Sequence, residues 1–186
     1  MLEDTPSFIQ RELSAGEKLI WSGQPRTGVC FRKQDALLIP FSLIWGGFAV
    51  FWEISVFRSN APIFFRLWGI PFVLVGIYLI IGRFFVDAKQ REKTFYAVTN
   101  SRIIIFSGLF SRNIRSLNLK ALPELNLDES SDGSGTILFG PIYSMMQNPG
   151  GGWPASGKYY TPAFEMIKNV RQVYDLVRRL QSDTVN

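Results

Sequence analysis

The residue types that usually carry catalysis or bind metals are scarce in this chain. It contains no histidine and a single cysteine, Cys30, among 186 residues. Histidine is the commonest general base and metal ligand, and it completes the triads of serine and cysteine enzymes. We therefore predict no catalytic residue, no zinc site, no cofactor and no internal disulfide bond.

The acidic and glycine-rich segments also give no strong indication of metal or phosphate binding. A magnesium site made only of carboxylates is conceivable at Asp128, Glu129 and Asp132, but these residues lie in and beside a predicted turn. Carboxylates in turns are ordinarily solvated or hydrogen-bonded to the local backbone, so we predict no metal there. The glycines 150–152 precede Trp153 and lack the lysine and helix start of a phosphate-binding loop.

One candidate contact surface is cationic and lies around the third predicted strand. Its members are Arg112, Arg115 and Lys120. Such side chains could meet acidic lipid head groups or a protein partner. The alternative is that they form the solvated polar face of an edge strand.

A second candidate surface lies in the long loop from Gly140 to about Thr161. Its aromatic and methionine side chains are Met145, Met146, Trp153, Tyr159 and Tyr160. Trp and Tyr are favoured at membrane interfaces, and Met forms adaptable protein-binding surfaces. Loops of this length are often functional, but these residues could instead cover one end of the β domain.

The sequence contains two long apolar runs, Ala36–Phe57 and Leu67–Val86. If they span a membrane, they determine where the candidate surfaces lie with respect to it. A hydrocarbon core about 30 Å thick needs about 20 apolar residues in a helix. The uninterrupted apolar part of the second run, Leu67–Gly82, is shorter, so its span recruits Phe64, Phe65, Phe84 and Phe85. We predict a transmembrane hairpin over residues 36–87, with helices over about 36–57 and 64–86. Two core helices of a soluble protein are the alternative, but the remaining chain is too short to surround them.

Polar and small residues within the spans suggest two further roles. Glu53 is the only acidic residue in either span, and an intramembrane carboxylate is a functional candidate by default. It could serve a proton or ion path, reach the nearby interface, or pair with Arg58. Close packing of the two helices is predicted at the small residues Gly46, Gly47, Ala49, Gly69, Gly76 and Gly82.

Flanking charges predict the orientation of the hairpin, because cations near a span are retained on the cytoplasmic side. They are Arg26, Arg32 and Lys33 before the first span and Arg83, Lys89, Arg91 and Lys93 after the second. Both termini, including the segment 1–35, are therefore predicted to be cytoplasmic, and Ser59–Ile63 forms an external turn. The net charge of +5 fits attraction to an anionic leaflet better than nucleic-acid binding.

Residues 88–186 change to the period-two pattern of half-buried strands. We predict strands over 95–98, 102–106, near 117–120, 125–128, 136–139 and 163–167. The consecutive Ile103, Ile104 and Ile105 indicate burial on both faces of a sheet. A helix follows from Asn169, a good N-cap, to about Leu180.

Two segments of this sequence carry a family resemblance. The run from Tyr96 to Ile105 (YAVTNSRIII), followed by Ser107-Gly108-Leu109, resembles the bacterial pleckstrin-homology-like (PH-like) domain family, and Gly16–Pro25 is similar to the segment that precedes paired spans in its membrane-anchored members. The resemblance implies a seven-stranded, partly open β-barrel capped by a C-terminal helix at the bacterial inner membrane. The phosphoinositide motif of eukaryotic relatives is absent, because the loop Thr99–Ser101 is short and only Arg102 follows it.

Together these features predict an α+β membrane protein, with a transmembrane hairpin followed by a PH-like barrel and a C-terminal α-helix. Its expected function is that of a non-enzymatic interaction or scaffold module at the cytoplasmic face, which binds a protein partner, lipid head groups or its own copies. The alternative is a small oligomeric transport or pore-forming subunit with a path past Glu53. An enzyme acting on lipid through carboxylates alone would need two acidic residues converging in one pocket.

Overall fold

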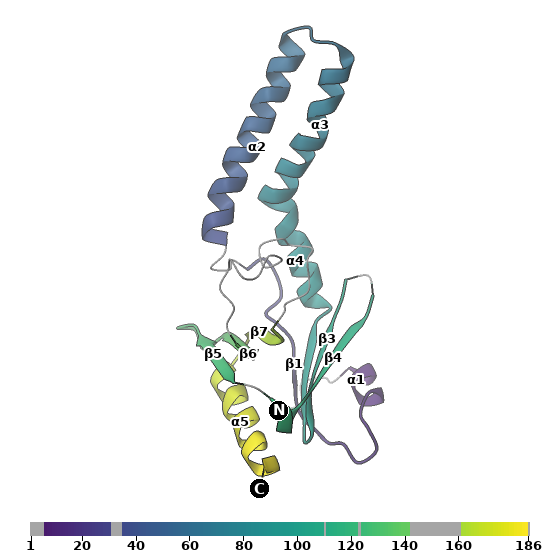
Figure 1. Ribbon diagram of the computed structural model, residues 1–186, viewed down its shortest axis with the longest axis vertical. Coiled ribbons are helices and arrows are strands. Elements are labelled where there is room, and N and C mark those ends of the chain that lie inside the picture. The colour runs from purple at the N-terminus through teal and green to yellow at the C-terminus, as the bar shows by residue number, and fades with distance from the viewer. Residues whose placement is uncertain (1–5, 31–34, 110, 123, 142–160, 186) are drawn as a thin grey trace. The chain divides into compact units, whose positions relative to one another are not determined.

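The computed structural model describes residues 6–30, 35–109, 111–122, 124–141 and 161–185. The chain divides into two compact units (Figure 1). One unit combines the residues up to Gly28 with those from Lys89 onward and contains the β-strands, and the other is the helical segment Val29–Ala88. The hairpin is thus an insertion within the sequence of the β unit.

A four-stranded antiparallel sheet forms the first half of the β unit. Its order is β1-β2-β3-β4, with bounds Leu19–Gly23, Phe95–Thr99, Arg102–Ser107 and Asn113–Asn118. The strands predicted over 95–98 and 102–106 are confirmed. The third one starts earlier than expected and ends at Asn118, whose side-chain oxygen accepts a hydrogen bond from the Lys120 backbone N–H at 2.9 Å and begins the 3-10 turn Leu119–Ala121.

Strand β1 is the element that the sequence pattern did not assign to the β domain. The sequence pattern predicts residues 1–35 as a separate N-terminal segment, but β1 pairs with β2, with Gly23 opposite Tyr96. Its Trp21 ring packs against Phe164 at 5.5 Å between centroids. The strand therefore completes the edge of the sheet and covers the core.

A three-stranded antiparallel sheet and a helix complete the β unit. The order is β5-β6-β7, with bounds Leu125–Glu129, Gly135–Phe139 and Ala163–Ile167, and helix α5 covers Val170–Val185. The predicted strands are confirmed, and the helix extends beyond the expected Leu180. Asn169 precedes it in a left-handed conformation with φ of 50°.

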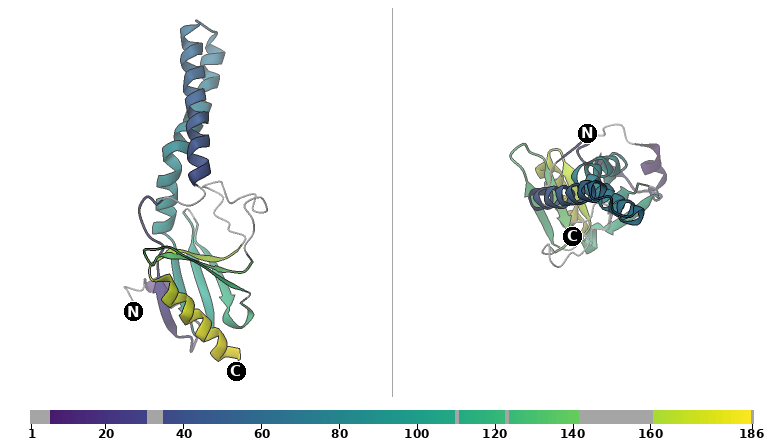
Figure 2. Two further views of the ribbon diagram at one scale, coloured as in Figure 1. Left: turned by 90° about the vertical axis from the view of Figure 1, so that its left-hand side faces the viewer. Right: turned by 90° about the horizontal axis from the view of Figure 1, so that it is seen from above.

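The main core lies between the two sheets and α5, which lies against them in Figure 2. Ile103 and Ile105 point into this core. Ile104 points to the opposite face and packs with Ile9 of the short helix α1 (Ser7–Arg11). Burial of the isoleucine run on both faces is therefore confirmed.

The seven described strands do not close into a barrel. Hydrogen-bonded pairing within the described residues leaves β4 and β5 in separate sheets. Between them the chain leaves the first sheet through the 3-10 turn and buries Leu119 and Leu122 in the main core. The structure thus has two sheets and a C-terminal helix, not a continuous cylinder.

The helical unit forms a hairpin of α2 (Asp35–Arg58) and α3 (Ile63–Ile77), and the second arm continues through a π-helical turn (Tyr78–Gly82) into α4 (Arg83–Glu92). Two helices, Leu38–Arg58 and Ile63–Glu92, are long and apolar enough to cross a membrane. Large apolar side chains such as Ile44 and Phe51 are exposed along them.

Glycines set the closest approach of the two arms. A Cβ on Gly76 would lie 2.9 Å from the Cα of Gly46, so neither position has room for a side chain. Gly47, by contrast, has no neighbour within 4 Å of its Cβ position. The predicted close packing is therefore confirmed at Gly46 and Gly76 but wrong at Gly47, which faces away from the partner helix.

Candidate functional site

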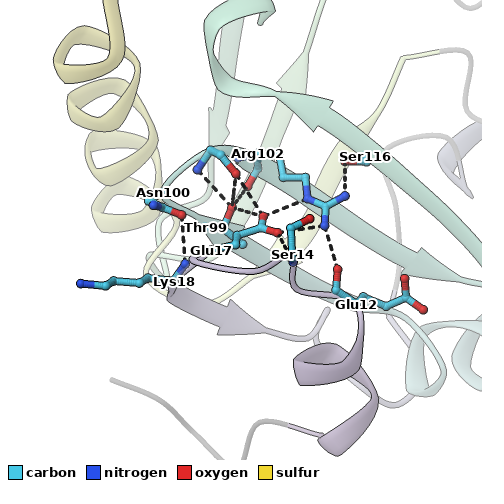
Figure 3. A network of polar contacts seen from close by, with 9 residues as sticks. Glu12, Ser14, Glu17, Lys18, Thr99, Asn100, Arg102 and Ser116 are labelled. Atoms are coloured by element: carbon cyan, nitrogen blue, oxygen red, sulfur yellow. Dashed lines mark hydrogen bonds and ion pairs between the residues drawn. The ribbon is translucent and has the colours of Figure 1, made fainter.

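The densest polar network of the β unit surrounds the carboxylate of Glu17 (Figure 3). One carboxylate oxygen accepts hydrogen bonds from the Thr99 hydroxyl at 2.7 Å and from Nε of Arg102 at 2.8 Å. The other accepts from the Ser14 backbone N–H at 2.8 Å and from Nη2 of Arg102 at 2.9 Å. The pairing of Arg102 with Glu17 is bidentate, and we call it the Glu17–Arg102 clasp.

The β2–β3 turn and the N-terminal segment supply the rest of the network. The Arg102 guanidinium also donates to the Glu12 backbone carbonyl at 2.7 Å. Two hydrogen bonds join Lys18 to Asn100, one backbone to backbone at 3.1 Å and one from the Lys18 N–H to the Asn100 side chain at 3.0 Å. The segment before β1 is thereby fixed to the turn that follows β2.

The burial and pKa of Glu17 indicate that the Glu17–Arg102 clasp has a structural role. The Glu17 side chain is 3% exposed, and its hydrogen bonds to Arg102 lower its pKa from 4.5 to about 2. A carboxylate with such a low pKa and with both oxygens occupied is a poor general base. The network therefore stabilises the fold, and its geometry does not indicate catalysis.

A pocket of about 290 Å³ lies on the outer face of the four-stranded sheet, beside the β3–β4 turn. Its apolar walls are Phe8, Phe95, Phe106 and Leu109, and its polar lining is Glu92, Lys93, Ser107, Gly108, Ser111 and Arg112. Glu92 is the sole carboxylate in this lining, and it pairs with Lys89 at 3.2 Å. The pocket thus lacks the two converging acids that a carboxylate-only enzyme would need.

The structure separates the three cations that the sequence grouped together. Arg112 lines the pocket, and its guanidinium lies over the Phe8 ring at 4.8 Å from the centroid. Arg115 is half-buried opposite Ile105, and exposed Lys120 follows the far end of β4. Because this strand is 6 residues long, or about 20 Å, Arg112 and Lys120 do not form one site.

Lys93 is a cation of the pocket lining that sequence reasoning did not identify as a candidate. Its place in the sequence puts it among the cations that flank the second span. In the fold its ammonium donates to the Leu109 carbonyl at 2.9 Å across the pocket lining. The signal available in the sequence was only its position, at the junction where the apolar span gives way to the first strand of the β domain.

The second candidate set lies outside the described residues. It comprises Met145, Met146, Trp153, Tyr159 and Tyr160. Their proposed contact with lipid or protein therefore stays a prediction.

Two polar groups of the hairpin, at Glu53 and at Arg83, have defined surroundings in the structure. The Glu53 carboxylate lies against Gly69 of the other arm, where a Cβ would overlap it, and among the described residues its buried oxygens have no hydrogen-bond partner. No pairing with Arg58 is formed in this part of the structure. At the other end of the hairpin, Arg83 and Asp35 form an ion pair at 3.2 Å, with 5% and 13% of their side chains exposed.

Metal coordination has no structural support in the described part of the chain, where no three His, Cys, Asp or Glu side chains gather. Cys30 is a free, half-buried thiol. Searches with protein-family models, among curated proteins and among solved structures found no match to this chain. The fold and the site geometry are therefore the basis for any functional conclusion.

Proposed function

We propose that this protein is a membrane-anchored, non-enzymatic recognition module of the PH-like type. In this proposal the α2–α3 hairpin spans the inner membrane, and the β unit lies at the cytoplasmic face, where it binds another molecule. The order of the seven strands, four in one sheet and three in the other followed by α5, supports the PH-like part.

The observation that carries the proposal is the pairing of β1 with β2. These strands precede and follow the hairpin, yet Ser22 lies opposite Ala97 and Gly23 opposite Tyr96. They can pair only if both ends of the hairpin emerge on the same side of a membrane, which is what two spans produce. The flanking cations favour the cytoplasmic side.

The hairpin supplies the anchor through its apolar exterior. Side chains such as Ile44, Phe51 and Ile63 are more than two-thirds exposed in the unit. Hydrocarbon would cover this surface at a gain of about 25 cal/mol for each Å². The Arg83–Asp35 ion pair joins the two arms at the end of the hairpin from which the chain continues into the β unit.

Proximity labelling from the C-terminus of the full chain in cells tests the recognition role. The control is the full chain with Ile103→Asp, which places a charge in the main core but leaves the hairpin sequence intact. We expect inner-membrane or cytoplasmic neighbours that the control loses. An identical neighbour set for both chains would show that the β unit recognises nothing and would overturn the proposal.

A further inference from the structure

We propose that the edge of β4, together with the pocket beside it, docks an extended segment of a partner protein by strand addition. The segment carries a large apolar residue two positions from an acidic residue. This inference rests on the proposed function, since it names the partner and the surface of that recognition role. It concerns the β unit alone.

Strand β4 offers backbone groups that an added strand can use. Among the described residues it pairs with β3 alone, and it ends the order β1-β2-β3-β4. An edge strand presents a row of N–H and C=O groups with which a further strand can pair. An extended peptide satisfies such groups with its own backbone, which favours a protein segment as the occupant.

An apolar row crosses the outer face of the four-stranded sheet and ends at this edge. Phe95 lies opposite Phe106, and Phe106 lies opposite Ile114 of β4. The two phenylalanines line the pocket, whereas Ile114 is 40% exposed. No other large apolar side chain in the described part of the β unit is exposed to this degree. An added strand would place one of its side chains beside Ile114 and so extend the row.

Two cations lie at the end of the sheet where β4 begins. Arg112 directly precedes the strand, and both Arg112 and Lys93 line the pocket. The charge of Glu92 in the same lining is balanced by Lys89 at 3.2 Å. Stacking on Phe8 at 4.8 Å orients the Arg112 guanidinium, whose planar donors match a carboxylate.

The spacing between apolar and charged groups defines the expected motif. Residues two positions apart on a strand lie on the same face. A partner residue beside Ile114 therefore brings the residue two positions away to the level of Arg112, where the pocket of about 290 Å³ opens. Ser107 and Ser111 add hydroxyl donors for a carboxylate in that position.

The test uses the purified full chain in dodecyl maltoside micelles and the dye-labelled peptide Gly-Glu-Thr-Val-Thr-Glu-Gly, followed by fluorescence anisotropy. Glutamate stands two positions on either side of valine, so the motif is present for both directions of the added strand. The matched peptide has glutamine in place of both glutamates. We expect the glutamate peptide to bind about fivefold more tightly, the effect of two exposed ion pairs. Equal binding of the two peptides would overturn the proposal.

Variants of the chain locate the binding surface. Arg112→Gln and Lys93→Gln should each weaken the glutamate peptide about threefold and leave the glutamine peptide unchanged. Ile114→Thr keeps a β-branched side chain in β4 and should weaken both peptides about fivefold, because apolar contact is lost. If Ile114→Thr lowers the melting temperature, the exposed Arg112 and Lys93 decide the outcome.

Lys120→Gln is the matched control, because it removes the same charge from the far end of β4 and should leave both affinities unchanged. Equal weakening by Lys120→Gln and the two pocket variants would indicate diffuse attraction and overturn the proposal. Unchanged binding in both pocket variants would overturn it as well.

Methylation of the peptide backbone tests strand addition itself. Successive N–H groups of a strand point to opposite sides, so N-methylation of valine and of the threonine after it should differ. One of the two peptides should lose binding and the other should keep it. Loss in both, or in neither, would overturn strand addition.

Two further outcomes would assign the surface to another occupant. Displacement of the peptide by an equal concentration of dihexanoyl phosphatidylglycerol would assign the pocket to a lipid. A dimer that Ile114→Thr converts to a monomer in native mass spectrometry would assign the edge to a second copy of the chain. Either result overturns the proposal.

The peptide assay and the labelling experiment fail independently. Absence of peptide binding by the purified chain refutes this docking site alone, since neighbours held by another surface would still depend on the β unit. Peptide binding together with an unchanged neighbour set for Ile103→Asp would refute the proposed function alone.

Discussion

Substitution of Glu17 by Gln tests the clasp that joins the N-terminal segment to the β2–β3 turn. The pKa of Glu17 falls from 4.5 to about 2 through its bonds to Arg102, which corresponds to an upper limit of about 3 kcal/mol in folding free energy. Arg102 is 29% exposed, so water screens part of this interaction. We expect Glu17→Gln to lower the free energy of unfolding by about 1–2 kcal/mol and the melting temperature by about 4–8 °C at pH 7.

The pH dependence of this difference has a defined sign. The folded-state pKa is depressed, so the stabilisation is complete above about pH 4.5 and is lost as the pH falls towards 2. At pH 3 the gap between Glu17→Gln and the natural chain should shrink to about 40% of its value at pH 7.

Thermal unfolding in micelles, followed by circular dichroism, measures both quantities. The exposed Glu124→Gln is the control and should change stability by less than about 0.5 kcal/mol. Equal stability of Glu17→Gln and the natural chain at pH 7, or a gap of the same size at pH 3, would refute this reasoning.

Three predictions concern the stability of the hairpin. Each is measured by unfolding the protein in sodium dodecyl sulfate and monitoring energy transfer between dyes on the two arms. Gly76→Leu forces the facing backbone apart and should cost about 1–3 kcal/mol, whereas Gly47→Leu should cost little; equal effects would contradict the packing. Glu53→Leu removes buried oxygens that have no partner in the described residues and should stabilise the hairpin by about 1–3 kcal/mol, so a loss of stability would count against this placement. Arg83→Leu breaks the 3.2 Å pair with Asp35 and should cost about 3–5 kcal/mol, most of which Asp35→Leu in the same chain restores; no recovery would show that the pair is not coupled.

The sequence predicted the elements whose pattern is local. Alternating residues identified β2, β3, β5, β6 and β7, and apolar length identified both arms of the hairpin. The isoleucines of β3 were assigned correctly to two faces, because an unbroken apolar run indicates a strand covered on both sides, here by the main core and by Ile9 of α1.

Contacts across the inserted hairpin were not predictable in the same way. Strand β1 is short, and its partner residues lie more than seventy positions later, as in the pair of Gly23 and Tyr96. Glu17 and Arg102 are 85 positions apart, and no periodicity links them. Both residues lie in the segments that carry the family resemblance. The resemblance, however, does not show which residues of the two segments are in contact.

Proximity in sequence does not show how charged side chains are distributed in the fold. Arg112, Arg115 and Lys120 are close in sequence, but an extended strand places its ends about 20 Å apart. Pairing of Glu53 with Arg58 of its own helix was one of three alternatives for this carboxylate. Glu53 lies instead against Gly69, where the missing side chain leaves space for the carboxylate.

Cysteine accessibility tests most directly the central claim that the hairpin holds one β unit at the cytoplasmic face. In a chain with Cys30→Ser, the exposed positions Lys18, Ser59 and Ser131 are changed singly to Cys and treated with a membrane-impermeant maleimide. We predict that Ser59→Cys is labelled in intact spheroplasts, and that Lys18→Cys and Ser131→Cys are labelled only after permeabilisation. Labelling of Lys18→Cys and Ser131→Cys from opposite sides would contradict the claim, since β1 and β2 could not then pair.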